Sequence, residues 1–584
     1  MNDLKRLFGY MGPYRRDMAL GMLLVVVESA FEMVIPILMS DIIDQGVAHG
    51  DVREIGWTGV EMAVCAVLAL ITGLLYARYA ARASYGFGAR IRQAEYAKVQ
   101  AYAFGNLDHF ETSSLITRMT TDVTVVQNAI NGGFRPMVRG PAMLVLGVAL
   151  SFYMSPSLAA VFFVCAPVLG VILFFIVRRI APLYARLQQA MDHLNTVVQE
   201  CLTAIRAVKA FVRGEYEEEK FQAVNTELMD VSMTTFRTAV LNLPAFQLTM
   251  YAAMVSILWF GGNMILQGSL TVGRLTSFLS YVLQVMNSLM MISNVFLLMT
   301  RSLASAHRIA AVLDEQVELA NPAHPVTEIP DGGVAFEHVS FKYHPDAAEY
   351  ALAGIDLVIQ PGETVGILGG TGSAKSTLVQ LIPRLYDATE GRVLVGGRDV
   401  REYDLTALRD AVGIVLQKNV LFSGTVRENL LWGNPGASDE ELWAACRAAC
   451  ADEFLQRMPG GLDADLGQGG VNVSGGQKQR LCIARTLLKK PRVLIFDDSV
   501  SAVDTATEAR IRKALAALTG VTKIIIAQRV TSVMNTDKIV VLEDGRIHAL
   551  GTHSQLLASD PIYQEIYHSQ MKGGGADGST ADHR

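Results

Sequence analysis

The chain has 584 residues, of which 51% are hydrophobic and only 18% are charged, and its mean hydropathy is +0.30. A typical soluble protein has about 25% charged residues, so this composition argues against a soluble globular protein and indicates a membrane part. The net charge of -6 leaves no basic excess for binding nucleic acid.

The first half of the chain is dominated by long apolar segments. Leu4, Leu7, Phe8 and Met11 share one helical face, which predicts a short helix lying on the membrane surface. Six apolar stretches follow, each near the ~20 residues that cross a bilayer as a helix. They predict an α-helical membrane domain with spans at 18–42, 56–79, 137–155, 157–177, 240–263 and 272–299.

Positive charge predicts how these spans are oriented. The short loops after the first, third and fifth spans contain only Arg53 and Arg274, whereas the segments on the other side are rich in lysine and arginine. We therefore expect a multi-pass protein of the cell membrane with both termini in the cytoplasm. The long segments 80–136 and 178–238 are helical in pattern and should extend beyond the bilayer. Candidate contact points for a cytoplasmic domain lie at their tips, near Gly105–Ser114 and Phe211–Tyr216.

Several polar residues lie inside the predicted spans. Glu28 and Glu32 are one helical turn apart, and intramembrane carboxylates are costly unless they face a cavity or a partner. They either line a polar substrate or ion pathway or form a structural pair near the outer membrane face. A second group of side chains shares one face of the last span. These side chains could adapt to varied apolar ligands, or they could simply pack against neighbouring helices. The group comprises Gln284, Asn287, Met291 and Asn294. Pro244 is expected to kink the fifth span.

Composition changes near residue 305, where prolines and glycines become frequent and short β-rich runs begin to alternate with helical ones. This pattern predicts a cytoplasmic α/β domain fused to the membrane domain. The expected boundaries are a membrane domain at 1–304, a linker at 305–333, a nucleotide-binding domain at 334–571 and a disordered tail at 572–584.

A glycine-rich loop in the second half has the context of a phosphate-binding loop. It lies between the apolar run 364–368 and the helical pattern 376–385. Successive backbone N–H groups of such a loop form an anion site, and its lysine reaches the outer phosphates of a nucleotide. The loop reads Gly369-Gly370-Thr371-Gly372-Ser373-Ala374-Lys375-Ser376-Thr377, with Ala374 where a glycine is expected.

Other polar residues follow apolar runs in the same region. Asp497 and Asp498 end a buried-strand pattern, and a carboxylate there can hold Mg²⁺ beside a triphosphate. Gln417 and Gln528 end two further runs, and Tyr343 could stack on a base. A second possible anion site is a polar turn that opens a helix, Ser474-Gly475-Gly476-Gln477.

Taken in this order, the motifs resemble those of an ATP-binding cassette (ABC) transporter of the exporter type, over the whole chain except the tail. The resemblance implies ATP with Mg²⁺ as ligands, with the metal near Ser376, Gln417 and Asp497. It identifies Gly369–Thr377 as Walker A, Gln417 as the Q-loop, Ser474–Gln477 as the signature motif and Val493–Asp498 as Walker B. It also matches the D-loop to Ser501–Asp504, which includes Asp504, the H-loop histidine to Gln528 and the A-loop aromatic to Tyr343.

Three positions depart from the family pattern. The catalytic glutamate after the Walker B aspartate is Asp498, the H-loop histidine is Gln528, and Ala374 replaces a glycine. A carboxylate one methylene shorter is displaced by about 1 Å, which can cost on the order of 10²-fold in rate. Glutamine cannot carry a proton's charge.

These departures predict one subunit of a heterodimeric exporter. The pocket built from its own Walker motifs would be degenerate, and its signature motif would complete a partner's hydrolytic site. A membrane partner of the same kind and a small amphipathic, drug-like or lipid-like substrate are expected. An active homodimer, an importer of this architecture and a membrane-tethered ATP sensor remain alternatives.

Overall fold

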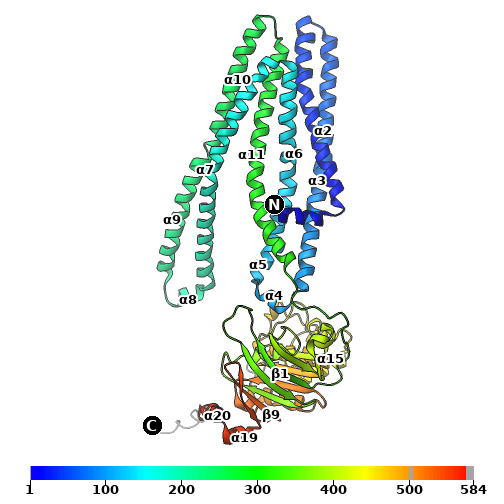
Figure 1. The fold of residues 1–584 in the computed structure, drawn as a ribbon, viewed down its shortest axis with the longest axis vertical. Helices are drawn as coiled ribbons and strands as arrows, with labels where there is room; N and C mark the ends of the chain where they lie inside the picture. The colour runs from blue at the N-terminus through cyan, green and yellow to red at the C-terminus, as the bar shows by residue number, and fades with distance from the viewer. Residues whose placement is uncertain (1, 499–503, 574–584) are drawn as a thin grey trace. The chain divides into compact units, whose positions relative to one another are not determined.

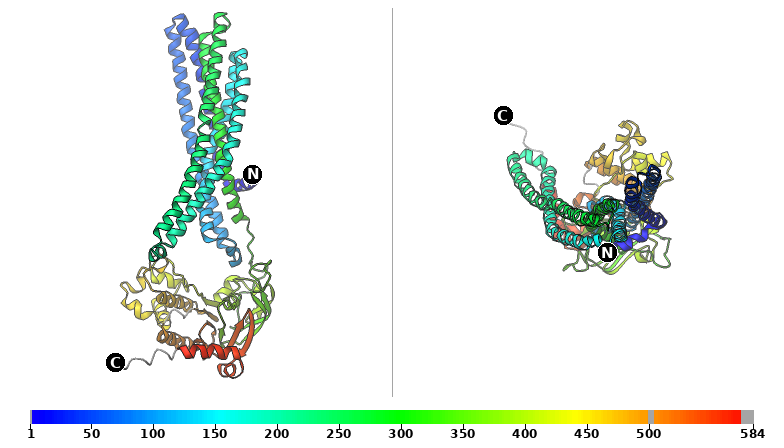
Figure 2. Two further views of the ribbon diagram at one scale, coloured as in Figure 1. Left: turned by 90° about the vertical axis from the view of Figure 1, so that its left-hand side faces the viewer. Right: turned by 90° about the horizontal axis from the view of Figure 1, so that it is seen from above.

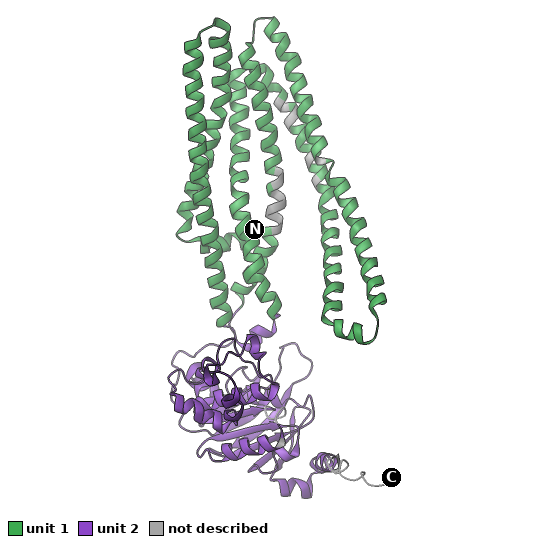
Figure 3. Cartoon of the chain, turned by 180° about the vertical axis from the view of Figure 1, so that it is seen from behind, with its two compact units in different colours: residues 1–100, 112–315 green, residues 101–111, 316–584 purple. Residues whose placement is uncertain are grey.

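The computed structural model describes residues 2–498 and 504–573, apart from several side chains of the long helices, Asn294 among them. These residues form two compact units (Figure 3). The first unit comprises Met1–Gln100 and Thr112–Glu315, and the second comprises Ala101–Glu111 and Gln316–Arg584.

The first unit is entirely helical where it is described. Six of its helical stretches are long and apolar enough to cross a membrane, which confirms the predicted fold class for the described residues. Its α-helices are α1 (Asn2–Leu7), α2 (Tyr14–Asp41), α3 (Val52–Gln100), α5 (Thr112–Thr117), α6 (Val123–Met154), α7 (Pro156–Thr203), α8 (Ile205–Ala210), α9 (Gly214–Ala239), α10 (Asn242–Leu266) and α11 (Val272–Asp314).

Within this unit, α2, α3, α6 and α11 pack against one another, while α7 and α9 run side by side (Figures 1 and 2). The pair α7 and α9 diverges from the other helices toward the short helix α8. Polar bonds between side chains and neighbouring helices tie the packed helices together. The Tyr281 hydroxyl donates to the Met33 carbonyl over 2.7 Å, and Arg308 pairs with Asp122 at 2.5 Å.

Two helix ends differ from the sequence prediction. Helix α11 continues through Asp314, into the expected linker, because Ala306 and Ile309 are buried in a core cluster and Arg308 pairs with Asp122. Pro244 stands in the first turn of α10 rather than inside a continuous span. It lacks an N–H, which fits a helix that begins there.

The second unit is built on two sheets. A six-stranded sheet has the order β10-β9-β3-β8-β7-β6, and a four-stranded antiparallel sheet has the order β2-β1-β4-β5. The strands are β1 (Val334–Phe341), β2 (Leu352–Ile359), β3 (Thr364–Leu368), β4 (Glu390–Val395), β5 (Arg398–Asp399), β6 (Val412–Val415), β7 (Val493–Asp497), β8 (Thr522–Ala527), β9 (Lys538–Glu543) and β10 (Arg546–Gly551). The α-helices are α4 (Phe104–Asp108), α12 (Lys375–Gln380), α13 (Leu405–Ala411), α14 (Val426–Leu431), α15 (Asp439–Ala448), α16 (Asp452–Arg457), α17 (Gly475–Leu488), α18 (Thr505–Ala516), α19 (His553–Ser559) and α20 (Pro561–Gly573).

The larger sheet is buried on both faces. Along β7, Val493 and Ile495 point into the core shared with the smaller sheet, and Leu494 and Phe496 point into the core formed with the helices. A strand covered on both sides needs apolar residues at every position, which explains its unbroken apolar run. Strands β3, β8, β7 and β6 are parallel, so the residues that follow them meet at one edge of the sheet.

Candidate functional site

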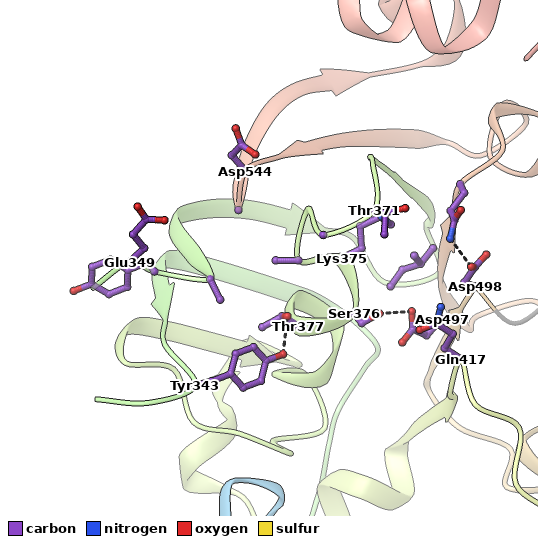
Figure 4. A pocket seen from close by; sticks show the side chains of 17 residues that line it. Tyr343, Glu349, Thr371, Lys375, Ser376, Thr377, Gln417, Asp497, Asp498 and Asp544 are labelled. Atoms are coloured by element: carbon purple, nitrogen blue, oxygen red, sulfur yellow. Dashed lines mark hydrogen bonds between the residues drawn. The ribbon is translucent and has the colours of Figure 1, made fainter. Parts of the chain in front are cut away.

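A pocket of about 670 Å³ opens at this edge of the larger sheet (Figure 4). It brings together residues that are far apart in the sequence but follow neighbouring parallel strands. From the predicted set, its lining includes Tyr343, Thr371, Gly372, Ala374, Lys375, Ser376, Thr377, Gln417, Asp497, Asp498 and Gln528. Nothing in the local sequence pattern marks the remaining lining positions as parts of a site, so the sequence reasoning missed them. They are Glu349, Tyr350, Ala351, Ile526, Asp544 and Gly545.

The glycine-rich loop wraps around its own lysine. Lys375 is 8% exposed, and its Nζ donates to the carbonyls of Gly369 and Gly370 over 3.0 and 2.6 Å. It also donates to Ser373 Oγ over 3.2 Å. Burial lowers the pKa of Lys375, while the carboxylates of Asp498 and Asp497 oppose that shift. A buried cation held by carbonyls is well placed to exchange these weak partners for phosphate oxygens.

Ala374 departs from the glycine pattern in its backbone as well as its side chain. It adopts a left-handed conformation with φ 67° and ψ 26°. A glycine populates this region without penalty, whereas an L-residue pays roughly 1 kcal/mol or more. The loop has therefore kept its fold at the expense of strain and an added methyl group.

Two carboxylates follow β7 and have different partners. Ser376 Oγ donates to Asp497 Oδ1 over 2.7 Å, and Gln528 Nε2 donates to Asp498 Oδ2 over 2.9 Å (Figure 4). Burial raises the pKa of both aspartates, and these hydrogen bonds oppose the rise. The hydroxyl and carboxylate oxygens of Ser376 and Asp497 are the hard ligands that Mg²⁺ prefers, so the chemistry of this pair fits the ion. Figure 4 places Gln417 beside Asp497.

An aromatic cluster closes the other end of the pocket. The Tyr343 hydroxyl shares a 2.8 Å hydrogen bond with Thr377 Oγ1, and its ring meets Tyr386 edge to face at 5.4 Å. Tyr386 in turn meets Phe104 of α4 edge to face at 5.9 Å and donates to Asp108 Oδ2 over 2.7 Å. The segment Ala101–Glu111, which overlaps the predicted tip near Gly105–Ser114, is therefore linked by Tyr386 to the tyrosine that lines the pocket. The role of Tyr386 was not foreseen, because no motif surrounds it.

The polar turn Ser474–Gln477 lies outside this pocket, at the N-terminus of α17. It forms a reciprocal cap, since Gln477 N–H donates to Ser474 Oγ over 3.4 Å and Ser474 N–H donates to Gln477 Oε1 over 2.8 Å. Asp504 caps α18 by accepting from the Thr507 N–H over 2.9 Å. The remaining predicted D-loop residues, 501–503, lie outside the described residues.

Comparisons with known proteins identify this architecture. A family model of the ABC transporter transmembrane region matches residues 18–289, and the ABC transporter model matches residues 352–501. YfiB of Bacillus subtilis, an uncharacterized ABC transporter ATP-binding protein, is 37% identical over 99% of this chain and 100% of its own. The chain belongs to the ABC transporter family.

Further ABC relatives agree with this assignment. The ATP-dependent lipid A-core flippase of Chromobacterium violaceum is 34% identical over 98% of each chain. A bacterial Atm1-family ABC exporter with ATP bound is similar in structure, with a TM-score of 0.81 and 25% identity over 97% of this chain and 100% of that chain. The protein is therefore an ATP-driven ABC exporter half-transporter with a cytoplasmic ATP-binding domain, and such exporters work as dimers of halves.

The polar residues predicted in the membrane half of this ABC exporter are not gathered at one place. Glu28 and Glu32 line a separate pocket formed by α2 and α3, and they pair with arginines of α6 that the sequence reasoning overlooked. On α11, Gln284 and Met291 are half-buried and Asn287 is exposed, and these three do not line that pocket. The Asn294 side chain lies outside the described residues.

Proposed function

We propose that this chain is the degenerate-site subunit of a heterodimeric ABC exporter. The observation that carries the proposal is the hydrogen bond from Gln528 to Asp498. At these two positions the family uses glutamate to polarise the attacking water and histidine to contact the γ-phosphate. Here the neutral Gln528 amide donates a hydrogen bond to one oxygen of the shorter Asp498 carboxylate. The two side chains would therefore bind each other instead of polarising the attacking water and contacting the γ-phosphate.

The parts that bind nucleotide are retained in the same pocket. Lys375 and the N–H groups of the loop would hold the phosphates, and Tyr343 would support the base. Ser376, Asp497 and Gln417 would hold the Mg²⁺, which neutralises phosphate charge when it is bound. We infer that the pocket binds ATP and hydrolyses it slowly.

The intact signature turn has a different role in this proposal. The reciprocal cap between Ser474 and Gln477 leaves the backbone N–H groups at the start of α17 directed outward for a phosphate. Offered to ATP held by a partner with complete Walker motifs, this turn would complete the site that hydrolyses. The chain alone would then be a weak ATPase.

The two predicted tips would carry ATP-driven closure of the cytoplasmic domains to the membrane helices. The first tip, in α4, contacts Tyr386 as described. The second tip exposes three apolar side chains, with Phe211, Val212 and Tyr216 accessible at 78%, 87% and 59%. Exposed apolar residues at the end of a helical pair are typical of a docking surface, and a partner's cytoplasmic domain would cover them.

The substrate proposed for this exporter is amphipathic and drug-like or lipid-like. The half-buried Gln284 and Met291 of α11 are compatible with such a ligand. Relatives named as lipid A-core flippases support a lipid-like molecule, although that name describes those proteins.

Isolation of the tagged chain from its native membrane tests the pairing. We expect a second half-transporter to co-purify in equal amount, with a glutamate after its Walker B aspartate and an H-loop histidine. Recovery of only self-associated chains with robust ATPase would support the homodimeric exporter instead. A regulatory ATP sensor would alter a partner's activity upon binding nucleotide without moving any substrate across reconstituted vesicles.

A further inference from the structure

A second pocket, of about 540 Å³, lies within the membrane-spanning unit and has a polar end and an apolar wall. Helix α3 supplies the wall through residues spaced at helical intervals, among them Ala66, Gly73 and Ala77. Glu28, Glu32 and Arg135 supply the polar end. The pocket therefore combines a charged end with a lipid-like surface inside one protein unit.

Four charged side chains form a connected network at this end. Arg135 bonds to Glu28 at 2.5 Å, while Arg139 bridges the two carboxylates, at 3.1 Å to Glu28 and 2.5 Å to Glu32. The network has two positive and two negative groups, so its formal charge is zero. This balance explains how four ionisable residues are tolerated within the spans of the bundle.

The four side chains are not equally accessible. Glu28 and Arg139 are 5% and 20% exposed, whereas Glu32 and Arg135 are 28% and 40% exposed. The two more exposed groups have opposite charges, and both line the pocket. A ligand entering the pocket thus meets one carboxylate and one guanidinium.

The network is also incompletely satisfied. In the described part of the chain, Glu28 Oε2 and Arg135 Nε are buried and have no hydrogen-bond partner. Buried polar groups are normally paired, and a network built only to join helices would be expected to use these atoms. One atom is an acceptor and the other a donor, so the ion pair between Glu28 and Arg135 keeps unused hydrogen-bonding capacity on both sides.

The backbone is shaped to admit this arrangement. A Cβ on Gly73 would lie 3.2 Å from Glu28 Oε1 and 3.8 Å from an Arg135 nitrogen. A side chain at position 73 would therefore press on the Glu28 carboxylate and narrow the pocket beside it. Gly73 thus leaves space for the Glu28 carboxylate and the Arg135 guanidinium to pair beside α3.

We propose that this pocket binds the head group of a zwitterionic amphiphile. Its ammonium group lies against Glu32 and Glu28, its phosphate or carboxylate lies against Arg135, and its chain follows the apolar wall of α3. A zwitterion leaves the site neutral, whereas a purely cationic or anionic ligand leaves a net charge in a low-dielectric environment. This inference rests on the proposed export of amphipathic substrates and specifies their class.

Binding is tested on the purified full chain in a neutral maltoside detergent, without ATP. The probes are dodecyl phosphoethanolamine, dodecyl phosphate and dodecylamine, which share one chain and differ in head-group charge. We expect the phosphoethanolamine probe to raise the melting temperature most and to bind at least about tenfold more tightly than the others. Equal binding of all three, or a preference for the purely anionic or the purely cationic probe, would overturn the proposal.

Variants of the apolar wall separate binding from folding. Ala77→Leu adds bulk to the pocket wall and leaves the four charged residues in place, and Ala63→Leu adds the same group to an exposed position of α3 outside the pocket. The first should weaken binding of the zwitterion about tenfold, and the second should leave it unchanged. Equal affinities in both variants would contradict the assignment.

Glu32→Gln replaces the more exposed carboxylate by a neutral amide whose oxygen can still accept from Arg139. The network then has one excess guanidinium, so the preference should move to dodecyl phosphate. A purely structural network would show no such change of preference.

Vesicle assays distinguish a transported molecule from a bound membrane lipid. ATP-dependent movement of a fluorescent zwitterionic amphiphile by the complete transporter supports a substrate at this site. Binding without movement also supports the site and assigns it to a bilayer lipid, and in that case the proposed substrate class fails while the site stands. The ATPase and partner assays test the degenerate pocket independently of either result.

Discussion

The ATP pocket and the Ser474–Gln477 turn are both proposed to bind phosphate through backbone N–H groups, but they differ in how far they keep the residues of the family pattern. In the pocket, Ala374 is held at a positive φ, and Asp498 bonds to Gln528. In the turn, Ser474 and Gln477 form a complete reciprocal cap. In the proposed heterodimer, this difference would let one chain bind ATP and complete a partner's site while its own hydrolytic groups have changed.

The largest effect is expected from Gly475→Glu in the complete transporter. A Cβ at Gly475 meets nothing within 4 Å, so the chain should fold, but the added carboxylate would repel the partner's ATP. Loss of a preorganised donor site for phosphate costs on the order of 10²-fold in turnover. The steady-state ATPase rate measures this, with Gly475→Ala as the matched control that should remain active. Normal turnover with the glutamate would separate the turn from hydrolysis.

A smaller effect is expected from Lys375→Ala, which acts on binding in the other region. Hydrogen bonds to a charged group contribute about 1.5–3 kcal/mol, so ATP affinity at this pocket should fall roughly 10- to 100-fold. The ATPase rate of the complete transporter should fall less than with Gly475→Glu. Equilibrium binding of a fluorescent nucleotide measures the loss, and Lys513→Ala, at an exposed position of α18, is the control. If both lysine variants bind ATP like the unmodified chain, the pocket assignment is wrong.

Two variants of Tyr343 separate the contribution of its ring to ATP binding from that of its hydroxyl. Tyr343→Leu removes the ring and should weaken ATP binding by about tenfold, because aromatic contacts contribute around 0.5–1.5 kcal/mol beyond their area. Tyr343→Phe removes only the hydroxyl that meets Thr377 and should change affinity by less than about threefold. The same nucleotide titration distinguishes them, and identical behaviour of the two variants would argue against base stacking.

The smallest effect is expected at Tyr386. Tyr386→Phe keeps the contacts of the ring with Tyr343 and Phe104 but removes the hydrogen bond to Asp108, a loss of about 1 kcal/mol. ATP affinity should be unchanged, while stimulation of the ATPase by transported substrate should fall by up to about fivefold. Asp108→Ala, which removes the acceptor, should reproduce the result. A change in affinity without a change in stimulation would place Tyr386 in the pocket rather than in the coupling segment.

Much of the nucleotide site could be predicted because its residues follow buried strands. Apolar runs marked β3, β7 and β8, and the residues after parallel strands must meet at one edge, as Lys375, Asp497 and Gln528 do. Tyr386 and Asp544 were missed because they come from positions without a motif, brought near by the tertiary fold.

The pocket at Glu28 and Glu32 in the membrane-spanning unit could be predicted only in part. The spacing of Glu28 and Glu32 marked them as unusual, but their partners lie on α6, more than one helix away in the sequence. Arg135 and Arg139 repeat the same one-turn spacing, and that match of opposite charges is the signal that could have identified the pair. Which helices face each other is decided by packing, and a span-by-span analysis contains no information on it.

The proposed degeneracy of the ATP pocket is tested most directly by the ATPase rate of the purified chain alone, compared with its Asp498→Glu, Gln528→His double variant. In a self-assembled pair, each pocket faces an intact signature turn, so only the hydrolytic groups differ between the two proteins. The account predicts slow turnover by the unmodified chain and an increase on the order of 10- to 100-fold in the double variant. Rapid turnover by the unmodified chain, abolished by Asp498→Asn and not increased by the double variant, would contradict it.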